Sequence, residues 1–262
     1  MPTLNLNGLR LDYVDSGHGL VIIFLPGLCG SKAWFCYQIA GLSDNFRVIA
    51  MNFRPFGKWG YSLELLTQDI NQLLTQLRTP AAAVCGHGLG ALVAIQFALS
   101  YPQRCLGLIL SSASPSFCHV TDEQIRSDMI IGQPGRSDLW GRILNLLFGK
   151  SKSRIDCSST DPLEFLALNN GAPDIATLDA RIKLMRETDL TPKLDRLRMP
   201  ALIVAGAKEP DYILTGCETL YEQIPDSTLE IIEDANHYHF YLRHDQFNTI
   251  VTEFLLTRIS PP

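Results

Sequence analysis

The sequence has no long hydrophobic run and no cluster of basic residues. No window comes near the ~18 uninterrupted apolar residues of a membrane-spanning helix, and residues 1–5 do not begin a basic segment followed by an apolar one. Lys and Arg are scattered singly in a chain of net charge −5, so no basic patch is predicted that would attract nucleic acid or an anionic membrane. We therefore expect an unexported, cytoplasmic protein with neither nucleic acid nor membrane among its partners.

Closely spaced cysteines are missing as well. The seven cysteines form no C-x-x-C pair, the spacing that a zinc site or a redox motif would use. Cys85 and Cys105 instead stand inside apolar runs, where a thiol packs as a small hydrophobic group. The sequence thus predicts a reducing compartment, no disulfide, no bound metal and no cofactor.

What the chain does have is apolar sequence arranged in short runs. Of its 262 residues 46% are hydrophobic and 19% charged, which is enough to bury one full-sized core. Apolar runs alternate with segments of helical period, and they cover residues 21–25, 48–51, 81–85, 106–110 and 201–205, with a last strand expected at 228–232. Continuous apolar strands are buried on both faces, so the pattern predicts an α/β fold with a mostly parallel sheet flanked by helices.

Two regions depart from this alternation. Residues 4–15 alternate apolar and polar side chains around Asn7-Gly8, which predicts an antiparallel hairpin. Between residues 114 and 200 the strands stop, and about 85 residues of helical character with Gly and Pro breaks intervene. We predict a core formed by residues 1–114 and 200–262, with a helical cap inserted at 115–199. Core helices are predicted at 62–77, after residue 88, and near 245–257.

A glycine-rich turn, Gly86-His87-Gly88-Leu89-Gly90, joins the apolar run at 81–85 to a predicted helix. Gly86, Gly88 and Ala91 match the dinucleotide-binding fingerprint G-x-G-x-x-G/A, in which the helix N-terminus holds a pyrophosphate. That site would need a carboxylate at the end of the next strand, and this strand ends without one. The turn also matches the nucleophile elbow G-x-S-x-G everywhere except at the serine, and we favour this second interpretation.

Further segments, in order along the chain, resemble the α/β-hydrolase superfamily. Residues 24–28, Phe-Leu-Pro-Gly-Leu, resemble the family's His-Gly loop with proline in place of histidine. Residues 52–57 resemble the D-x-R-G-x-G segment with two departures, residues 199–210 resemble the strand and loop that carry the triad acid, and Ala235-Asn236-His237 resembles the Gly-His that delivers the triad base. With the elbow they cover essentially the whole chain, and the resemblance implies an α/β-hydrolase fold of the esterase, lipase or C–C hydrolase type.

The resemblance also implies the positions of a catalytic triad. They fall on Gly88, His237 and Glu209, so glycine stands at the nucleophile position and no covalent acyl-enzyme can form there. Asp211 is left open as an alternative acid, and His239 is the nearest competitor as the base. The triad is therefore predicted to be degenerate, with its base and acid retained.

Backbone N–H groups supply the oxyanion hole in this family, so it survives changes of side chain. The resemblance assigns it to Leu28 and Leu89, which leaves a site able to polarise a carbonyl. With His237 as general base, a water molecule could attack directly, or the base could remove a proton from the substrate. The expected partner is a small, moderately apolar carbonyl-containing ligand beneath the cap; its identity and the oligomeric state are left open.

Glycine at position 88 has a second explanation. The elbow residue has a strained backbone that costs about 1–3 kcal/mol for a residue with a Cβ, and glycine relieves this strain. A protein that no longer needs catalysis could drift to glycine, and a deliberate substitution that traps a substrate would give the same residue. The alternative to a hydrolase is therefore a non-catalytic ligand-binding or interaction protein on the same fold. His87 and Cys29 are expected to pack rather than to react.

Overall fold

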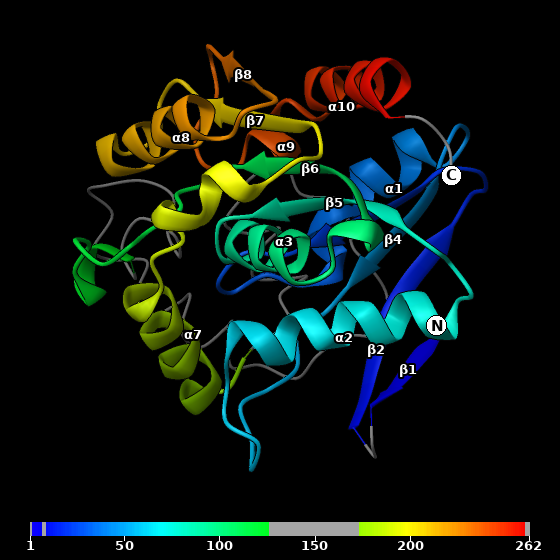
Figure 1. Cartoon of the computed structure of the whole chain (residues 1–262), viewed down its shortest axis with the longest axis horizontal. Coiled ribbons are helices and arrows are strands. Elements are labelled where there is room, and N and C mark those ends of the chain that lie inside the picture. Colours follow the sequence, from blue (N-terminus) through cyan, green and yellow to red (C-terminus); the bar gives the residue numbers. More distant parts are fainter. Residues whose placement is uncertain (1, 7–8, 126–172, 260–262) are drawn as a thin grey trace.

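An eight-stranded sheet forms the centre of the molecule (Figure 1). The computed structural model describes residues 2–6, 9–125 and 173–259. The strands are β1 (Thr3–Leu6), β2 (Leu9–Ser16), β3 (Val21–Leu25), β4 (Arg47–Met51), β5 (Ala82–His87), β6 (Cys105–Ser111), β7 (Ala201–Gly206) and β8 (Ser227–Ile232). Their order across the sheet is β1-β2-β4-β3-β5-β6-β7-β8. β2 runs antiparallel to β1 and β4 and the other pairs are parallel, so the expected mostly parallel sheet is confirmed.

Helices flank this sheet. The α-helices are α1 (Cys36–Leu42), α2 (Leu63–Gln76), α3 (Leu89–Ser100), α7 (Ile175–Glu187), α8 (Asp211–Gln223), α9 (His239–Leu242) and α10 (His244–Arg258), and the 3-10 helices are η1 (Lys32–Phe35), η2 (Pro102–Arg104) and η4 (Thr191–Arg196). α1 packs with α10, α2 packs with α3, and α8 packs on β7 and β8 (Figure 1). Every residue of β3, β5 and β7 is buried, as their continuous apolar sequences require.

Helix α2 shows how the sequence pattern becomes structure. The apolar spacing of three and four residues predicts a helix over residues 62–77, and the helix spans Leu63–Gln76. Ser62 caps it, since its hydroxyl accepts a hydrogen bond from the Leu65 N–H at 3.3 Å. Leu66, Ile70 and Leu73 are buried on the inner side, so one apolar stripe fixes the helix to the core.

The observed strands differ from the predicted ones mainly at their ends. β5 continues to His87 because Gly86 and His87 still pair in parallel with Leu110 and Ser111 of β6. Backbone pairing thus extends beyond the apolar residues that signalled the strand. The predicted hairpin is confirmed by the antiparallel pairing of β1 with β2, whereas its turn at residues 7–8 lies outside the described residues.

A long region of the chain connects β6 to β7. The Leu190 N–H donates to the Pro115 carbonyl at 3.0 Å, and Ser116 pairs with Asp189 as an isolated bridge, so the two ends of the intervening region lie side by side. Within this region the structure describes residues 115–125 and 173–199, which include α7 and η4. The helical cap at 115–199 lies partly outside the described residues, and the division into core and cap stays a prediction.

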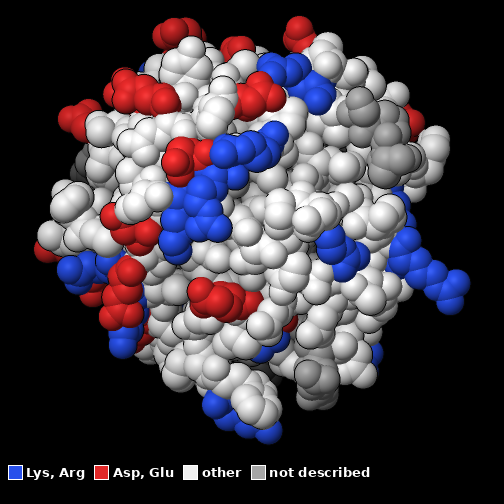
Figure 2. All heavy atoms as spheres, viewed as in Figure 1, with Lys and Arg blue, Asp and Glu red and all other residues white. Residues whose placement is uncertain are grey.

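Charged residues are mixed on the viewed surface. Figure 2 shows acidic and basic side chains interspersed among uncharged ones on this face. No helix within the described ranges is long and apolar enough to cross a membrane.

Candidate active site

The turn between β5 and α3 is sharp, and two of its glycines are required by close packing. Gly88 has φ 52° and ψ −111°, and its N–H donates to the Ser111 carbonyl at 3.1 Å. A Cβ on Gly86 would lie 2.1 Å from the Gly90 carbonyl oxygen, and one on Gly90 would lie 2.3 Å from the Leu25 carbonyl oxygen. Real side chains do not tolerate such contacts with backbone, so the elbow geometry itself accounts for both flanking glycines.

Gly88 differs from its neighbours because the space beside it is open. Among the described residues, a Cβ at this position would meet nothing closer than 4.0 Å, where it would find the Gly27 Cα and the Nε2 atom of His237. Only the positive φ angle favours glycine here. Position 88 therefore faces the predicted base, His237, and the space between them is large enough for one oxygen atom.

His237 and Glu209 form the pair predicted from the sequence. Glu209 lies in the loop between β7 and α8, and His237 lies in the loop after β8. The His237 Nδ1 atom is 2.9 Å from Glu209 Oε2, and both residues are buried. Neighbouring parallel strands place their following loops at the same edge of the sheet, which is why residues so far apart in sequence meet.

The Glu209 carboxyl group is ionised in this setting. Burial alone would raise its pKa, but the charge of His237, the hydrogen bond from His237, and contributions from His239 and Ser112 lower the pKa below its ordinary value. An ionised carboxylate only accepts hydrogen bonds, so Nδ1 of His237 carries the hydrogen. In the neutral ring Nε2 is then an unprotonated acceptor, directed at the gap beside Gly88.

A buried hydrogen-bonded chain continues behind this pair. The Ser112 hydroxyl donates to Glu209 Oε1 and lies 3.3 Å from Nδ1 of His239. Nε2 of His239 is 3.0 Å from the Ser111 hydroxyl, which lies 3.2 Å from Nδ1 of His87. The positions of the hydrogens follow from the carboxylate: since Ser112 donates to it, Nδ1 of His239 must donate to Ser112.

Burial keeps the histidines of this chain neutral. It lowers the pKa of His239 to about 4. With Nδ1 protonated in a neutral ring, Nε2 of His239 accepts from Ser111, which accepts in turn from His87. Burial, with His237 and His239 nearby, also lowers the pKa of His87 well below its ordinary value, and Nε2 of His87 has no hydrogen-bond partner among the described residues.

The structure places the sequence candidates differently. Asp211 is exposed at the first position of α8, and the carboxyl group that contacts His237 is that of Glu209. His239 is fully buried, and both of its ring nitrogens contact serine hydroxyls, so it does not face position 88 as His237 does. His87 packs at a ring-centroid distance of 4.5 Å from His237, and Cys29 is buried, as expected for packing residues.

The sequence did not indicate Ser111 and Ser112 as site residues, and it did not predict that His239 would lie between them in the hydrogen-bonded chain behind Glu209. Ser111 is the last residue of β6 and Ser112 follows it, and their only signal was their place at the carboxyl end of a central strand, where ligand sites of α/β sheets form. The oxyanion candidates lie where predicted: Leu28 is buried in the loop after β3, and Leu89 begins α3. Neither of their N–H groups donates to another described residue. For Leu89 this follows from its place at the start of α3, because the first N–H groups of a helix have no partner within the helix.

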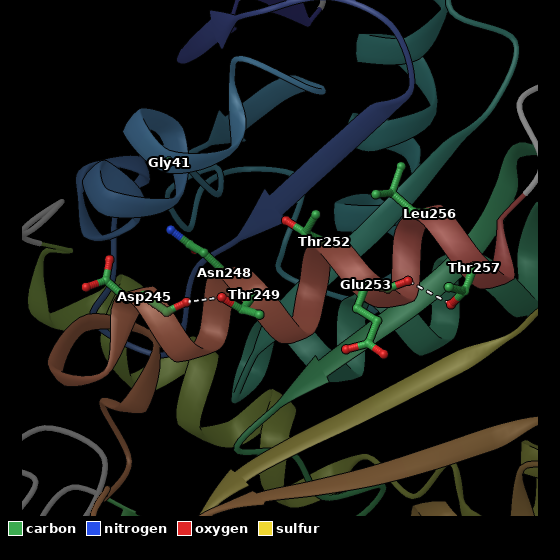
Figure 3. A pocket seen from close by; sticks show the side chains of 8 residues that line it. All are labelled: Gly41, Asp245, Asn248, Thr249, Thr252, Glu253, Leu256 and Thr257. Carbon is green, nitrogen blue, oxygen red and sulfur yellow. Dashed lines mark hydrogen bonds between the residues drawn. The ribbon is translucent and has the colours of Figure 1, made fainter.

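The described chain also has a surface pocket that lies apart from this site. This pocket is lined by Gly41 of α1 together with seven residues of α10 (Figure 3), namely Asp245, Asn248, Thr249, Thr252, Glu253, Leu256 and Thr257. None of these belongs to the turn at Gly88 or to the loops that carry Glu209 and His237. Among the described residues no group of three or more His, Cys, Asp or Glu side chains is arranged to hold a metal ion.

A strand–turn–helix elbow, a histidine aimed at it and a buried carboxylate behind that histidine define the acid–base half of a hydrolase site. Residues 21–243 match the model of the family with the alpha/beta hydrolase fold, and the chain belongs to this family.

Relatives and solved structures agree with this assignment. The chain is 30% identical over 245 residues to the pimeloyl-[acyl-carrier protein] methyl ester esterase of Serratia marcescens, covering 90% of this chain and 93% of the relative. It is 25% identical over 256 residues to the 3-oxoadipate enol-lactonase 2 of Acinetobacter baylyi, covering 95% and 94%. The crystal structure of a hydrolase from Pseudomonas aeruginosa superposes with a TM-score of 0.77 at 22% identity, covering 97% of each chain, which shows the fold.

Proposed function

We propose that this protein holds a small, moderately apolar carbonyl compound beside Gly88 and hydrolyses it without a covalent intermediate, with His237 as general base on a water molecule. The observation that carries this proposal is the 4.0 Å separation between the Cβ position of Gly88 and Nε2 of His237, with no described atom closer to that position. A water oxygen placed between that position and Nε2, where a side-chain oxygen at residue 88 would lie, would be within hydrogen-bond distance of Nε2. Similar proteins are named as an esterase and a lactonase, which favours an ester or lactone carbonyl as the substrate.

The proposed reaction needs only groups of this chain and water. Nε2 of His237 takes a proton from water as the water oxygen attacks the carbonyl carbon, and Glu209 stabilises the imidazolium that forms. The N–H groups of Leu28 and Leu89 donate hydrogen bonds to the carbonyl oxygen and stabilise the negative charge that develops on it. When the intermediate collapses, the C–O bond to the leaving group breaks and the departing oxygen takes the proton from Nε2.

The second candidate is a ligand-binding protein on the same fold. It is favoured by the positive φ angle of Gly88, because glycine relieves strain that a catalytic side chain would impose. Slow hydrolysis of an activated ester that His237→Ala abolishes would support the hydrolase. Ligand-induced thermal stabilisation without any turnover would support the binding protein.

The experiment that tests the site directly is labelling with a fluorophosphonate, read by intact mass, on this chain and on Gly88→Ser. The reagent reports an activated serine without knowledge of the substrate. We expect no specific adduct on the unaltered chain and one adduct on Gly88→Ser. The double variant Gly88→Ser with His237→Ala should lose that adduct, and Gly88→Ser with Asp211→Asn should keep it. A folded Gly88→Ser that stays unlabelled would contradict a retained base and oxyanion hole.

A further inference from the structure

Arg181 of α7 is buried next to the loop that follows β3. The residue is 4% exposed, and its Nη1 atom donates to the Leu28 carbonyl at 2.6 Å. Its Nε atom donates to the Tyr61 hydroxyl at 2.9 Å, where α7 lies beside the N-terminal end of α2 (Figure 1). Since the N–H of Leu28 is one of the two proposed oxyanion donors, the guanidinium contacts the same loop that would hold the reacting carbonyl.

This arginine has no anionic partner in the part of the chain that the structure describes. Arg47 and Arg54 each form two hydrogen bonds to a carboxylate, with Asp15 and Asp69. Arg181 forms no ion pair with any described residue, and its Nη2 atom donates to none of them. The guanidinium of Arg181 therefore has N–H donors that no described residue uses, and a planar acceptor with two oxygen atoms would match them.

The groups around Arg181 do not supply a negative charge either. Burial raises the pKa of Tyr61, so its phenol is neutral and cannot serve as a counter-ion. The nearby charges of Arg54 and Asp69 are paired with each other and cancel. Among the described residues the positive charge of Arg181 is therefore uncompensated, and its guanidinium carbon lies 5.7 Å from the centre of the Phe53 ring.

A buried cation with neutral partners is costly, and an anion that reaches it with good geometry offsets that cost. We propose that the ligand carries a carboxylate in addition to its carbonyl group, and that Arg181 binds this carboxylate while the carbonyl faces Leu28 and His237. A single uncompensated charge suits one carboxylate rather than a phosphate dianion. The location of the carbonyl rests on the proposed function, whereas the carboxylate site rests on Arg181 alone.

The test uses ligands that cannot be hydrolysed, so it is independent of turnover. The probes are methyl ketones that end in a carboxylate, with two to six methylene groups between, and neutral ketones with a methyl group in place of the carboxylate. Calorimetric titration of the whole chain should show the acid binding about tenfold or more tightly than its neutral counterpart at the best chain length, as for a hydrogen-bonded charge pair. Arg181→Gln should lose that difference, and Arg181→Lys should keep part of it. Tyr61→Phe is the matched control, because it removes the Nε partner and leaves the charge.

Each outcome bears on the proposal. A preference for the acids that disappears in a folded Arg181→Gln, and persists in part in Arg181→Lys, supports it. Equal binding of acids and ketones, or a preference that survives Arg181→Gln, overturns it and leaves the proposed reaction standing. Binding of neither series overturns the carboxylate site. An Arg181-dependent preference in a protein whose Gly88→Ser variant does not label would keep the carboxylate site and remove the hydrolase.

Discussion

Ser112 shows how the residues behind the candidate base are held. It has a φ angle of 46°, a left-handed conformation that a residue with a side chain adopts at a cost of about 1–3 kcal/mol. Its N–H donates to the Val204 carbonyl, and its hydroxyl reaches both Glu209 and the His237 carbonyl. A strained residue persists where its surroundings determine its position. Ser112 therefore acts as a positioning residue that ties β6 to the loops of β7 and β8.

His239 makes stability depend on pH at the residue scale. Its pKa is about 4 in the folded protein, against about 6.5 in an unfolded chain. Between these values the unfolded state binds more protons, so stability is full above pH 6.5 and falls as the pH drops towards 4. We expect the free energy of unfolding in urea to fall by about 2 kcal/mol or more from pH 7 to pH 5, with His87 contributing in the same direction.

Variants can show whether His239 causes this pH dependence of stability. His239→Gln should show a clearly smaller fall, whereas replacement of the exposed His18 by Gln should leave the fall unchanged. Glu209 has a lowered pKa, so its contribution is lost only at more acidic pH and does not obscure this window. A protein equally stable at pH 7 and pH 5 would contradict the burial of neutral histidines described above.

At the residue scale the sequence could predict the pair of His237 and Glu209, but not the residues that hold this pair in place. His237 and Glu209 stand at fixed places after strands, so their roles follow from chain order. Ser112 and His239 are assigned only by three-dimensional contact, because a serine and a second histidine have no distinctive spacing. The choice of Glu209 over Asp211 likewise depends on where α8 begins, which a difference of two residues in the sequence does not reveal.

At the scale of elements, the β5–α3 elbow was the most predictable part of the molecule. Apolar runs give the type and order of the strands, since burial on both faces demands them. They do not give the ends, and β5 continues through Gly86 to His87 because pairing with β6 does not depend on side-chain polarity. The sequence distinguishes Gly88 by its place in the motif, but it does not reveal that close backbone contacts require Gly86 and Gly90 whereas only a positive φ angle favours glycine at position 88.

This difference predicts opposite tolerance to a methyl group. Gly86→Ala places its Cβ against the Gly90 carbonyl oxygen at 2.1 Å, so we expect a loss of more than about 3 kcal/mol in the free energy of unfolding. Gly88→Ala has open space and should lose only the strain of its φ angle, about 1–2 kcal/mol. Urea unfolding followed by circular dichroism measures both. Equal stability of the two variants would show that the elbow relaxes around Gly86.

At the scale of the whole molecule, the candidate site joins two parts of the chain that residues 115–199 separate. Gly88 and Ser112 come before this region, and Glu209 and His237 come after it. The parts meet through the parallel pairing of β6 with β7 and through the Cys217 thiol, which donates to the Ala113 carbonyl at 3.2 Å. One continuous sheet therefore positions the acid–base pair relative to the elbow, and the site exists only while both parts are folded together.

We therefore expect the two parts to unfold in one transition, which buried thiols can report. Cys85 and Cys105 lie before residues 115–199 and Cys217 lies after them; all three are buried, and burial raises the pKa of Cys105 and Cys217 to about 12. Alkylation with iodoacetamide at increasing urea, read by peptide mass, should expose all three at the same midpoint, whereas the exposed Cys118 should react without urea. If Cys217 reacts at lower urea than Cys85, the part after β6 unfolds alone. The carboxylate of Glu209 would then lose its contact with Ser112 before the fold is lost, and the pairing of β6 with β7 could not be what holds the site together.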